Sequence, residues 1–358
     1  MNQQKRHQGI DLMRVLCMLL IILYHIQGHG QLIASKHISP LNHALIVFMQ
    51  SIYQAAVDGY ALISGYIGYQ SRQKYSSLIL LWLRVLFYSV GITAAVWFVS
   101  PATVSHAAIK DSFFPLLKGQ YWYFSAYVGC FMLAPLVRSA ITQLSHRENT
   151  LYLGGILLVF SFLPYIMRTD PFYTANGNHA LWLLILYALG MYIRKYDPFS
   201  NFSVKGVSLL LGCACVLQIS ARPILGPVIR FLTEKSVSQW YFIAHDSPTT
   251  LLLAVLMLAL FSKLSFSCNN LFFRQLVSAS FSVYLIHDHP LIRQHVIIPL
   301  GARLANLPSL LLIPCLFACA LFIYLLCACL DYLREKLFSL LRIRTLLTLI
   351  ESKLHGRA

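Results

Sequence analysis

The chain has 358 residues, a formal net charge of +16, 58% hydrophobic residues and 11% charged residues. A soluble domain carries about 25% charged residues, so this composition excludes a soluble globular protein. The basic residues lie in short stretches between apolar blocks and form no continuous patch, which excludes a nucleic-acid-binding protein. The expected fold class is all-α, a polytopic transmembrane helical bundle.

Apolar blocks of membrane-spanning length recur along the chain and predict about ten spans. We expect them at approximately 10–27, 42–69, 77–99, 121–141, 150–167, 179–193, 203–221, 248–262, 275–298 and 308–330. Pro290 is expected to bend or break the ninth span, because proline lacks the amide proton that a helix needs.

The distribution of lysine and arginine predicts the orientation of these spans. With the N-terminus in the cytoplasm, 17 of the 28 basic residues fall on the cytoplasmic side and nine on the outer side. This bias predicts that both termini are cytoplasmic. The basic C-terminal tail is expected to lie on the inner leaflet. The nine cysteines are interpreted as packing residues, because none has a histidine at zinc-ligand spacing, and no metal site is expected.

The first span carries an arginine near its start and a histidine near its end. Arg14 and His25 are eleven residues apart, which in a helix is close to three turns, so both face one side about 16 Å apart. Asp11 lies near the same face. Charged groups in a membrane helix turn inward to a partner or a wet cavity. The alternative is that Arg14 extends to the headgroups and His25 marks the far interface.

Other polar groups in the apolar blocks have a functional and a structural interpretation. Asp58 is costly in a span, so we expect it to have a partner in a site or a structural ion pair. Ser64 and Gly65 fit close helix packing as well as chemistry. Trp122 and Tyr123 are equally typical of interface anchors and of site walls.

Three consecutive residues near the C-terminus, His287, Asp288 and His289, have the composition of a metal or catalytic cluster. Adjacent residues on a helix point to different faces, so we expect that the three cannot converge. The sequence therefore predicts that His287 alone lines a site.

Four motifs, in order along residues 9 to 290, resemble those of the membrane acyltransferase family often called acyltransferase type 3. In that family the first helix contains an arginine, ten further residues and then a histidine. The second span is rich in aromatic residues and contains Ser-Gly-aromatic. A Trp-Tyr/Phe pair opens the fourth span, and near the end a serine is followed by Tyr-Leu-Ile-His. The matching positions are Arg14 and His25; Asp58, Ser64, Gly65 and Tyr66; Trp122 and Tyr123; and Ser282, Tyr284 and His287. Family members also carry several arginines at the cytoplasmic end of the third span. Here that region has Arg72, Lys74 and Arg84 at looser spacing.

The resemblance implies a transmembrane acyltransferase domain over residues 1–333 and a basic cytoplasmic tail over 334–358. It implies O-acetyl transfer from cytoplasmic acetyl-CoA to a hydroxyl of a cell-surface polysaccharide or its lipid-linked precursor, in a bacterial inner membrane. His25 would be the general base, acting directly or through an acyl-histidine, because histidine titrates near neutrality. Arg14 would bind the donor or hold the helix in register, and Arg84, Arg72 and Lys74 would bind the phosphates of coenzyme A. Asp58, Ser64, Tyr66, Trp122, Tyr123 and His287 would line the acceptor site.

Two other classes of protein remain open from the residues alone. A transporter or flippase of lipid-linked sugars would also have broken spans and inward polar groups. A sensor or scaffold would tolerate replacement of Arg14 and His25. Within the enzyme class, the acyl group could be another short one such as succinyl, and the oligomeric state is undetermined.

Overall fold

The all-α class is confirmed by the computed structural model, which describes residues 7–71, 74–234, 241–266 and 270–355. Helices account for 79% of the residues, and these ranges contain no strand. Within them, seven segments are long and apolar enough to cross a membrane: Gln8–Gln27, Tyr75–Val99, Trp122–Gln143, His146–Met167, Val204–Ala221, Tyr241–Lys263 and Ser309–Leu340. The count of ten spans and the cytoplasmic position of both termini stay predictions.

Large apolar side chains remain exposed along several of these segments. Leu209 is 70% exposed, Phe322 66% and Leu310 85%. Exposed large apolar side chains along helices of membrane-spanning length are typical of a surface that contacts lipid. The exposed apolar faces therefore support an integral membrane protein.

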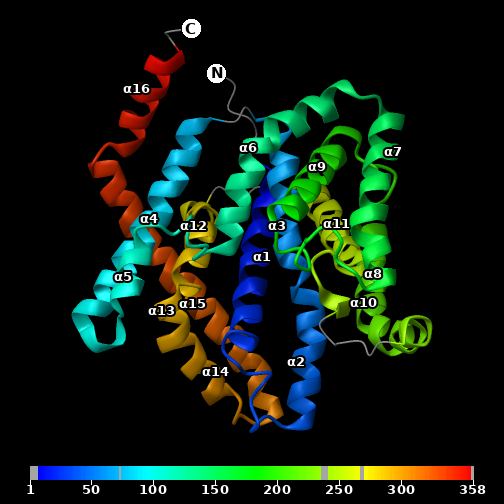
Figure 1. Cartoon of the computed structure of the whole chain (residues 1–358), viewed down its shortest axis with the longest axis horizontal. Helices are drawn as coiled ribbons and strands as arrows, with labels where there is room; N and C mark the ends of the chain where they lie inside the picture. Colours follow the sequence, from blue (N-terminus) through cyan, green and yellow to red (C-terminus); the bar gives the residue numbers. More distant parts are fainter. Residues whose placement is uncertain (1–6, 72–73, 235–240, 267–269, 356–358) are drawn as a thin grey trace. The chain divides into compact units, whose positions relative to one another are not determined.

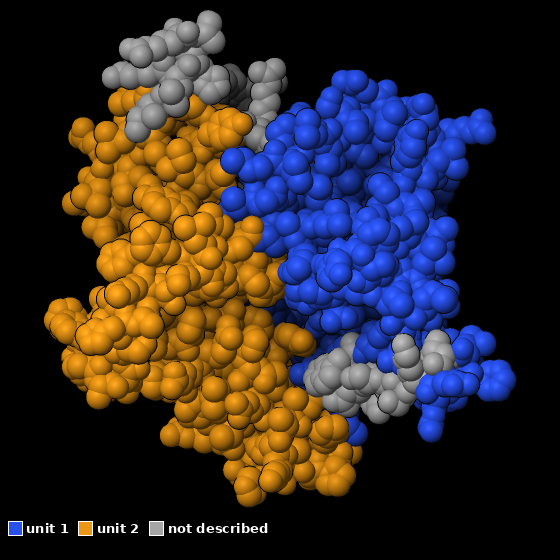
Figure 2. Space-filling model, in the orientation of Figure 1, with its two compact units in different colours: residues 1–21, 44–71, 126–268 blue, residues 22–43, 72–125, 269–358 orange. Residues whose placement is uncertain are grey.

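The chain divides into two compact units, which Figure 2 colours separately. Unit 1 comprises residues 1–21, 44–71 and 126–268, and unit 2 comprises residues 22–43, 72–125 and 269–358. Helix α1 (Gln8–Gln27) contributes its residues up to Ile21 to unit 1 and the rest to unit 2. Arg14 thus belongs to unit 1 and His25 to unit 2.

Unit 1 is built on the close packing of two helices, α3 and α9. At Gly65 of α3, a Cβ atom would collide with the backbone of Tyr187, and at Gly190 of α9 it would collide with the carbonyl oxygen of Leu62. Glycine is therefore required at both positions for the backbones to approach. Helix α11 also packs against α3. The elements of this unit are α3 (Ala55–Gly68), most of α6 (Trp122–Gln143), α7 (His146–Leu157), η2 (Leu158–Phe162), α8 (Leu163–Met167), α9 (Ala180–Tyr196), α10 (Val204–Thr233), η3 (Tyr241–Ile243) and α11 (Pro248–Lys263).

Unit 2 is organised around helix α12, which packs against α15 and α4 (Figure 1). Its elements are α4 (Tyr75–Val99), η1 (Pro101–Thr103), α5 (His106–Ser112), α12 (Leu271–His287), α13 (Pro290–Ile292), η4 (Arg293–Ile297), α14 (Ile298–Leu304), α15 (Ser309–Leu340) and α16 (Ile343–His355). Tyr88 of α4 is tied to a buried ion pair within α15: its Oη donates to Asp331 Oδ1 over 2.8 Å, and Arg334 Nε donates to the same oxygen over 2.7 Å. Helix α15 thus continues through residue 334, where the sequence suggests that the tail begins.

Two predicted spans are interrupted in the structure. The span expected at 275–298 breaks where α12 ends at His287 and α13 begins at Pro290, which confirms the prediction for that proline. The span expected at 42–69 consists of α2 (Pro40–Tyr53) and α3, separated by Gln54 alone. The backbone angles of Gln54 remain helical, φ −57° and ψ −35°. The second interruption is therefore slight, whereas the first releases residues 288 and 289 from the helix.

Candidate active site

His25 lies in the last turn of α1, where the apolar helix gives way to a glycine turn. The amide of Gly28 donates to the carbonyl of Tyr24 over 2.8 Å, and the amide of Gly30 donates to the carbonyl of His25 over 2.9 Å. A Cβ at Gly30 would collide with backbone atoms of α1 and η4, so glycine is required for this tight return. The turn folds His29 back onto His25, with 4.6 Å between the ring centroids.

A second histidine contacts His25 from the end of α12. The Nε2 atom of His287 lies 2.9 Å from the Nδ1 atom of His25. The other ring nitrogen of His287, Nδ1, lies 2.6 Å from the carbonyl oxygen of Val283, one turn earlier in the same helix. His25 is 7% exposed and His287 is 1% exposed. The structure thus brings together two of the predicted site residues that are far apart in the sequence.

Asp288 joins the same group, which corrects the expectation that His287 alone could reach it. The Oδ1 atom of Asp288 lies 3.5 Å from His25 Nδ1. The expectation assumed a continuous helix, but α12 ends at His287, so the next residue need not point to another face. His289 does point elsewhere, with Nε2 at 3.4 Å from Thr93 Oγ1 and 3.3 Å from the carbonyl oxygen of Ser89. Pro290 was the sequence signal for this helix end.

The carboxylate of Asp288 is the charged centre of the group. Its Oδ1 atom accepts a hydrogen bond from Arg293 Nη2 over 2.8 Å and lies 3.7 Å from His29 Nε2. The side chain of Asp288 is 3% exposed and that of Arg293 is 33% exposed. Burial lowers the pKa of His29 below its usual value of 6.5, while the Asp288 carboxylate raises it and the Arg293 guanidinium lowers it. The sequence reasoning missed His29, Asp288 and Arg293, because their proximity depends on the two turns.

His25, His29 and Asp288 each place one ligand atom within 4.8 Å of the others, which is a spacing that a metal ion could use. Two contacts disfavour that use. His25 Nδ1 is already 2.9 Å from His287 Nε2, and the Arg293 guanidinium already neutralises the Asp288 carboxylate. A metal cation would have to displace His287 from His25 Nδ1, and it would lie beside the positive charge of Arg293. The contacts are those of a hydrogen-bonded ion pair flanked by histidines.

Aromatic side chains extend from His287 to the predicted Trp-Tyr motif. The ring of Tyr284 lies 6.4 Å from that of His287 and 6.4 Å from that of Tyr123, which in turn lies 5.6 Å from that of Trp122. Tyr121 Oη donates to the carbonyl oxygen of Leu285 over 3.0 Å and fixes the start of α6 on α12. Two motifs that the sequence analysis singled out separately therefore meet in unit 2.

Arg14 is paired within its own helix. Its Nη1 atom lies 3.5 Å from Asp11 Oδ1, and Tyr60 Oη donates to the Arg14 carbonyl over 3.1 Å. The Arg14 side chain is 27% exposed, so part of the guanidinium remains accessible. The partner that the sequence predicted for a charge in this span is thus Asp11.

Asp58 lies in a second buried polar cluster, in unit 1. Trp182 Nε1 donates to Asp58 Oδ1 over 3.3 Å, and His245 Nδ1 lies 3.7 Å from the same oxygen. Gln54 Nε2 lies 3.1 Å from His245 Nε2. Asp58 is 1% exposed and His245 is 4% exposed. The expected partner of Asp58 is therefore present, but His245 and Trp182 carry no sequence pattern that would have identified them.

The remaining residues of the Ser-Gly-Tyr motif are engaged in contacts within unit 1. Ser64 Oγ donates to the Tyr60 carbonyl of its own helix over 2.9 Å. Tyr66 Oη accepts from Arg194 Nη1 over 2.9 Å, and the Arg194 guanidinium lies 4.9 Å above the Tyr66 ring. The contacts of Arg194 with Tyr66 hold α9 against α3.

Two of the predicted phosphate-binding residues, Lys74 and Arg84, lie at the N-cap and in the first half of α4. Arg84 Nη1 donates to the Ser278 carbonyl over 3.5 Å, and Arg84 Nε has no hydrogen-bond partner among the described residues. Lys74 is exposed at the N-cap of α4. Arg72 lies outside the described residues. Arg84 is thus a half-buried cation whose guanidinium has further N–H groups that can donate hydrogen bonds.

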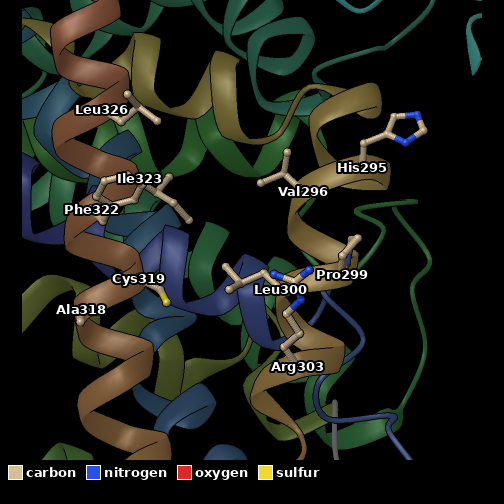
Figure 3. A pocket seen from close by; sticks show the side chains of 10 residues that line it. All are labelled: His295, Val296, Pro299, Leu300, Arg303, Ala318, Cys319, Phe322, Ile323 and Leu326. Carbon is tan, nitrogen blue, oxygen red and sulfur yellow. The ribbon is translucent and has the colours of Figure 1, made fainter. Parts of the chain in front are cut away.

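A separate cavity of about 560 Å³ opens in unit 2 between α15 and the η4–α14 segment. Its lining is mainly apolar, with Phe322 and Ile323 on one side and Val296 and Pro299 on the other, and the His295 ring points away from α15 (Figure 3). The residues that line it include none of the His25 group, which is defined as His25, His29, His287, Asp288 and Arg293. The cavity and the polar group are therefore distinct features of the unit.

Comparison with known proteins agrees with the motifs. A family model described as an acyltransferase domain matches residues 7–334, nearly the whole chain. No curated protein and no solved structure gives a significant match. The matched region includes His25, His29, His287, Asp288 and Arg293. With its apolar helices and this match, the chain is a membrane protein that belongs to the acyltransferase family of that model.

Proposed function

We propose that the protein is an O-acetyltransferase of the bacterial inner membrane that moves an acetyl group from cytoplasmic acetyl-CoA to a sugar hydroxyl. The acceptor is a cell-surface polysaccharide or its lipid-linked precursor. Acyltransferase activity follows from the family. The family match does not specify the acyl donor, the acceptor or the membrane, so these three features are proposed.

The observation that carries the proposal is the environment of His25. Its Nδ1 atom is 2.9 Å from His287 Nε2 and 3.5 Å from Asp288 Oδ1. A hydroxyl is a poor nucleophile until a base removes its proton, and a neutral histidine suits that task near pH 7. His25 is therefore the proposed general base.

Two routes use the same atoms. In direct transfer, His25 Nε2 takes the hydroxyl proton, the sugar oxygen bonds to the thioester carbonyl carbon, the carbon–sulfur bond breaks, and the proton passes to the departing thiolate. In the stepwise route, His25 Nε2 itself attacks the thioester and expels the thiolate. The sugar oxygen then displaces the imidazole from the acetyl group, and the hydroxyl proton passes to the thiolate. Both routes yield an O-acetyl sugar and free coenzyme A.

Basic residues supply the proposed donor contacts. Arg84 lies on α4 and is half-buried, and the accessible part of its guanidinium is the proposed contact for a phosphate of coenzyme A. Lys74, at the N-cap of the same helix, and Arg72 are the further proposed cations, and Arg14 is proposed to bind the donor or to hold α1 in register. Arginine suits this role because its planar donor group matches phosphate oxygens.

The acceptor contacts are proposed from the motif residues. Trp122 and Tyr123 present aromatic faces that can stack on sugar rings, and their contact with Tyr284 connects them to His287. Asp58, Ser64 and Tyr66 are the remaining proposed acceptor-site residues. Their contacts within unit 1 give them a packing role alongside any binding role.

Measurement of glycan acetylation tests the proposal. Cells that express the wild type, His25→Ala or His37→Ala are compared for O-acetyl groups per sugar at matched protein levels in the membrane. His37 is the matched control because its side chain is exposed and has no contact with the His25 group. Loss of a general base costs about 10²- to 10⁴-fold, so only His25→Ala should lose the acetyl signal. Equal acetylation in all three strains would reject the proposal, and a fall in exported glycan with unchanged acetylation per sugar would favour a transporter.

A further inference from the structure

The ring proton of His287 is located by its backbone partner. A carbonyl oxygen can only accept a hydrogen bond, so the Nδ1 atom of His287, 2.6 Å from the Val283 carbonyl oxygen, must carry a proton. In a neutral imidazole the other nitrogen then has a free lone pair. His287 Nε2 is thus an acceptor, and it points at His25.

The same reasoning continues to His25. Its Nδ1 atom lies 2.9 Å from an acceptor, His287 Nε2, and must therefore be the donor of that hydrogen bond. The Oδ1 atom of Asp288, 3.5 Å from the same Nδ1, is also an acceptor. The nearer acceptor, His287 Nε2, places the proton on Nδ1, which leaves the lone pair of His25 on Nε2.

We infer that His287 is a positioning residue: it holds the proton of His25 on Nδ1, so that Nε2 of His25 is always the basic, nucleophilic nitrogen. The inference rests on the proposed function, in which that nitrogen receives the hydroxyl proton or the acetyl group. The Val283 carbonyl accepts from His287 Nδ1, and His287 Nε2 accepts from His25 Nδ1. Both hydrogen bonds form with each imidazole ring neutral. Asp288 is the less suited orienting group, because it is 0.6 Å farther away (3.5 against 2.9 Å) and its Oδ1 already accepts from Arg293 over 2.8 Å.

Two substitutions separate orientation from packing. His287→Leu fills a similar space but removes the acceptor, whereas His287→Gln places an amide oxygen near the position of Nε2. Loss of a hydrogen-bond partner that orients a functional histidine costs about 10- to 100-fold at other sites. His287→Leu should therefore lower kcat by about that factor with KM values for acetyl-CoA and acceptor within about twofold, and His287→Gln should recover most of the loss. Equal losses in both variants, or a loss expressed only in KM, would overturn the inference.

A spectroscopic test needs no turnover. Solid-state ¹⁵N NMR of histidine-labelled protein in lipid bilayers distinguishes protonated from unprotonated ring nitrogens, and the spectrum of His25→Asn identifies the His25 signals. The expected wild-type state of His25 is a proton on Nδ1 and none on Nε2, and the expected change in His287→Leu is transfer of that proton to Nε2. A proton on Nε2 in the wild type, or the same tautomer in both proteins, would overturn the inference. If the spectra behave as expected while the purified protein transfers no acyl group, the positioning role stands and the proposed function fails.

Discussion

The Nδ1 atom of His25 and the Nε2 atom of His287 lie 2.9 Å apart, although 262 residues separate them in the chain. Each histidine occurs at the carboxyl end of a helix, α1 or α12, and each helix is followed at once by a turn. These turns allow His29 and Asp288 to fold onto the same pair. A buried polar group thus forms from two short segments, 25–29 and 287–293.

The ion pair between Asp288 and Arg293 should contribute to stability. Asp288→Asn removes the carboxylate charge and leaves the Arg293 guanidinium without its anion, which should lower the free energy of unfolding by about 1–3 kcal/mol. The measurement is thermal or chemical unfolding in detergent micelles. Adding Arg293→Gln to Asp288→Asn should cost less than the sum of the two single changes, since the pair is coupled. Strictly additive effects would contradict the pairing.

His29 should make stability depend on pH. Its pKa in the folded protein is below its usual value of 6.5, because burial disfavours the protonated ring. The unfolded chain therefore binds the proton more readily, so the contribution of His29 to stability is present above about pH 6.5 and is lost as the pH falls below it. Replacement by an uncharged residue should remove this dependence. Melting temperatures of the wild type and His29→Gln should converge or cross on acidification, whereas parallel curves would count against the prediction.

The glycines between α3 and α9 should be intolerant of even one methyl group. In Gly65→Ala the new Cβ would collide with the backbone of Tyr187, so overpacking should cost about 1–3 kcal/mol or more and reduce the amount of folded protein in the membrane. Gly154→Ala is the matched control in the same unit, since a Cβ there would meet nothing within 4 Å. Alanine in that helix should be neutral or slightly stabilising. Fluorescence-detected size-exclusion profiles of the two variants would compare them, and similar profiles would argue against close packing at Gly65.

Much of the fold could be predicted because membrane helices are specified by local composition. The apolar runs predicted α1, α4, α6 and α11 within a few residues, and Pro290 predicted the break after α12. The interruption at Gln54 could not be foreseen, since no proline or glycine adjoins it and its backbone angles remain helical.

The site was predictable only in part, because its members meet through tertiary structure. Arg14, His25 and His287 were recognised from motif spacing, which is a property of the sequence. Asp288 was excluded by assuming that a helix continued past His287. His29 and Arg293 join the group only because the turns after α1 and α12 bring them back, and no periodic pattern encodes those turns.

Arg84 should affect the donor and not the chemical step. If its half-buried guanidinium binds a phosphate of coenzyme A, Arg84→Ala should raise KM for acetyl-CoA about tenfold with little change in kcat, the pattern of lost uniform binding. Arg84→Lys should recover only part of the loss, because lysine keeps the charge but lacks the planar donor group. Initial rates over a range of acetyl-CoA concentrations provide the test, with exposed Arg147→Ala as the control. A changed kcat at constant KM would contradict the assignment.

The central claim is that His25 carries out acyl transfer, and the most direct measurement is the rate at which purified protein moves radiolabelled acetyl groups from acetyl-CoA to isolated surface glycan. Wild type and His37→Ala should label the glycan at equal rates, and His25→Ala, at equal amounts of folded protein, should be slower by about 100-fold or more. Transfer by His25→Ala within about twofold of the wild-type rate would contradict the account, because a barrier change that small leaves no room for a general base or nucleophile at this position.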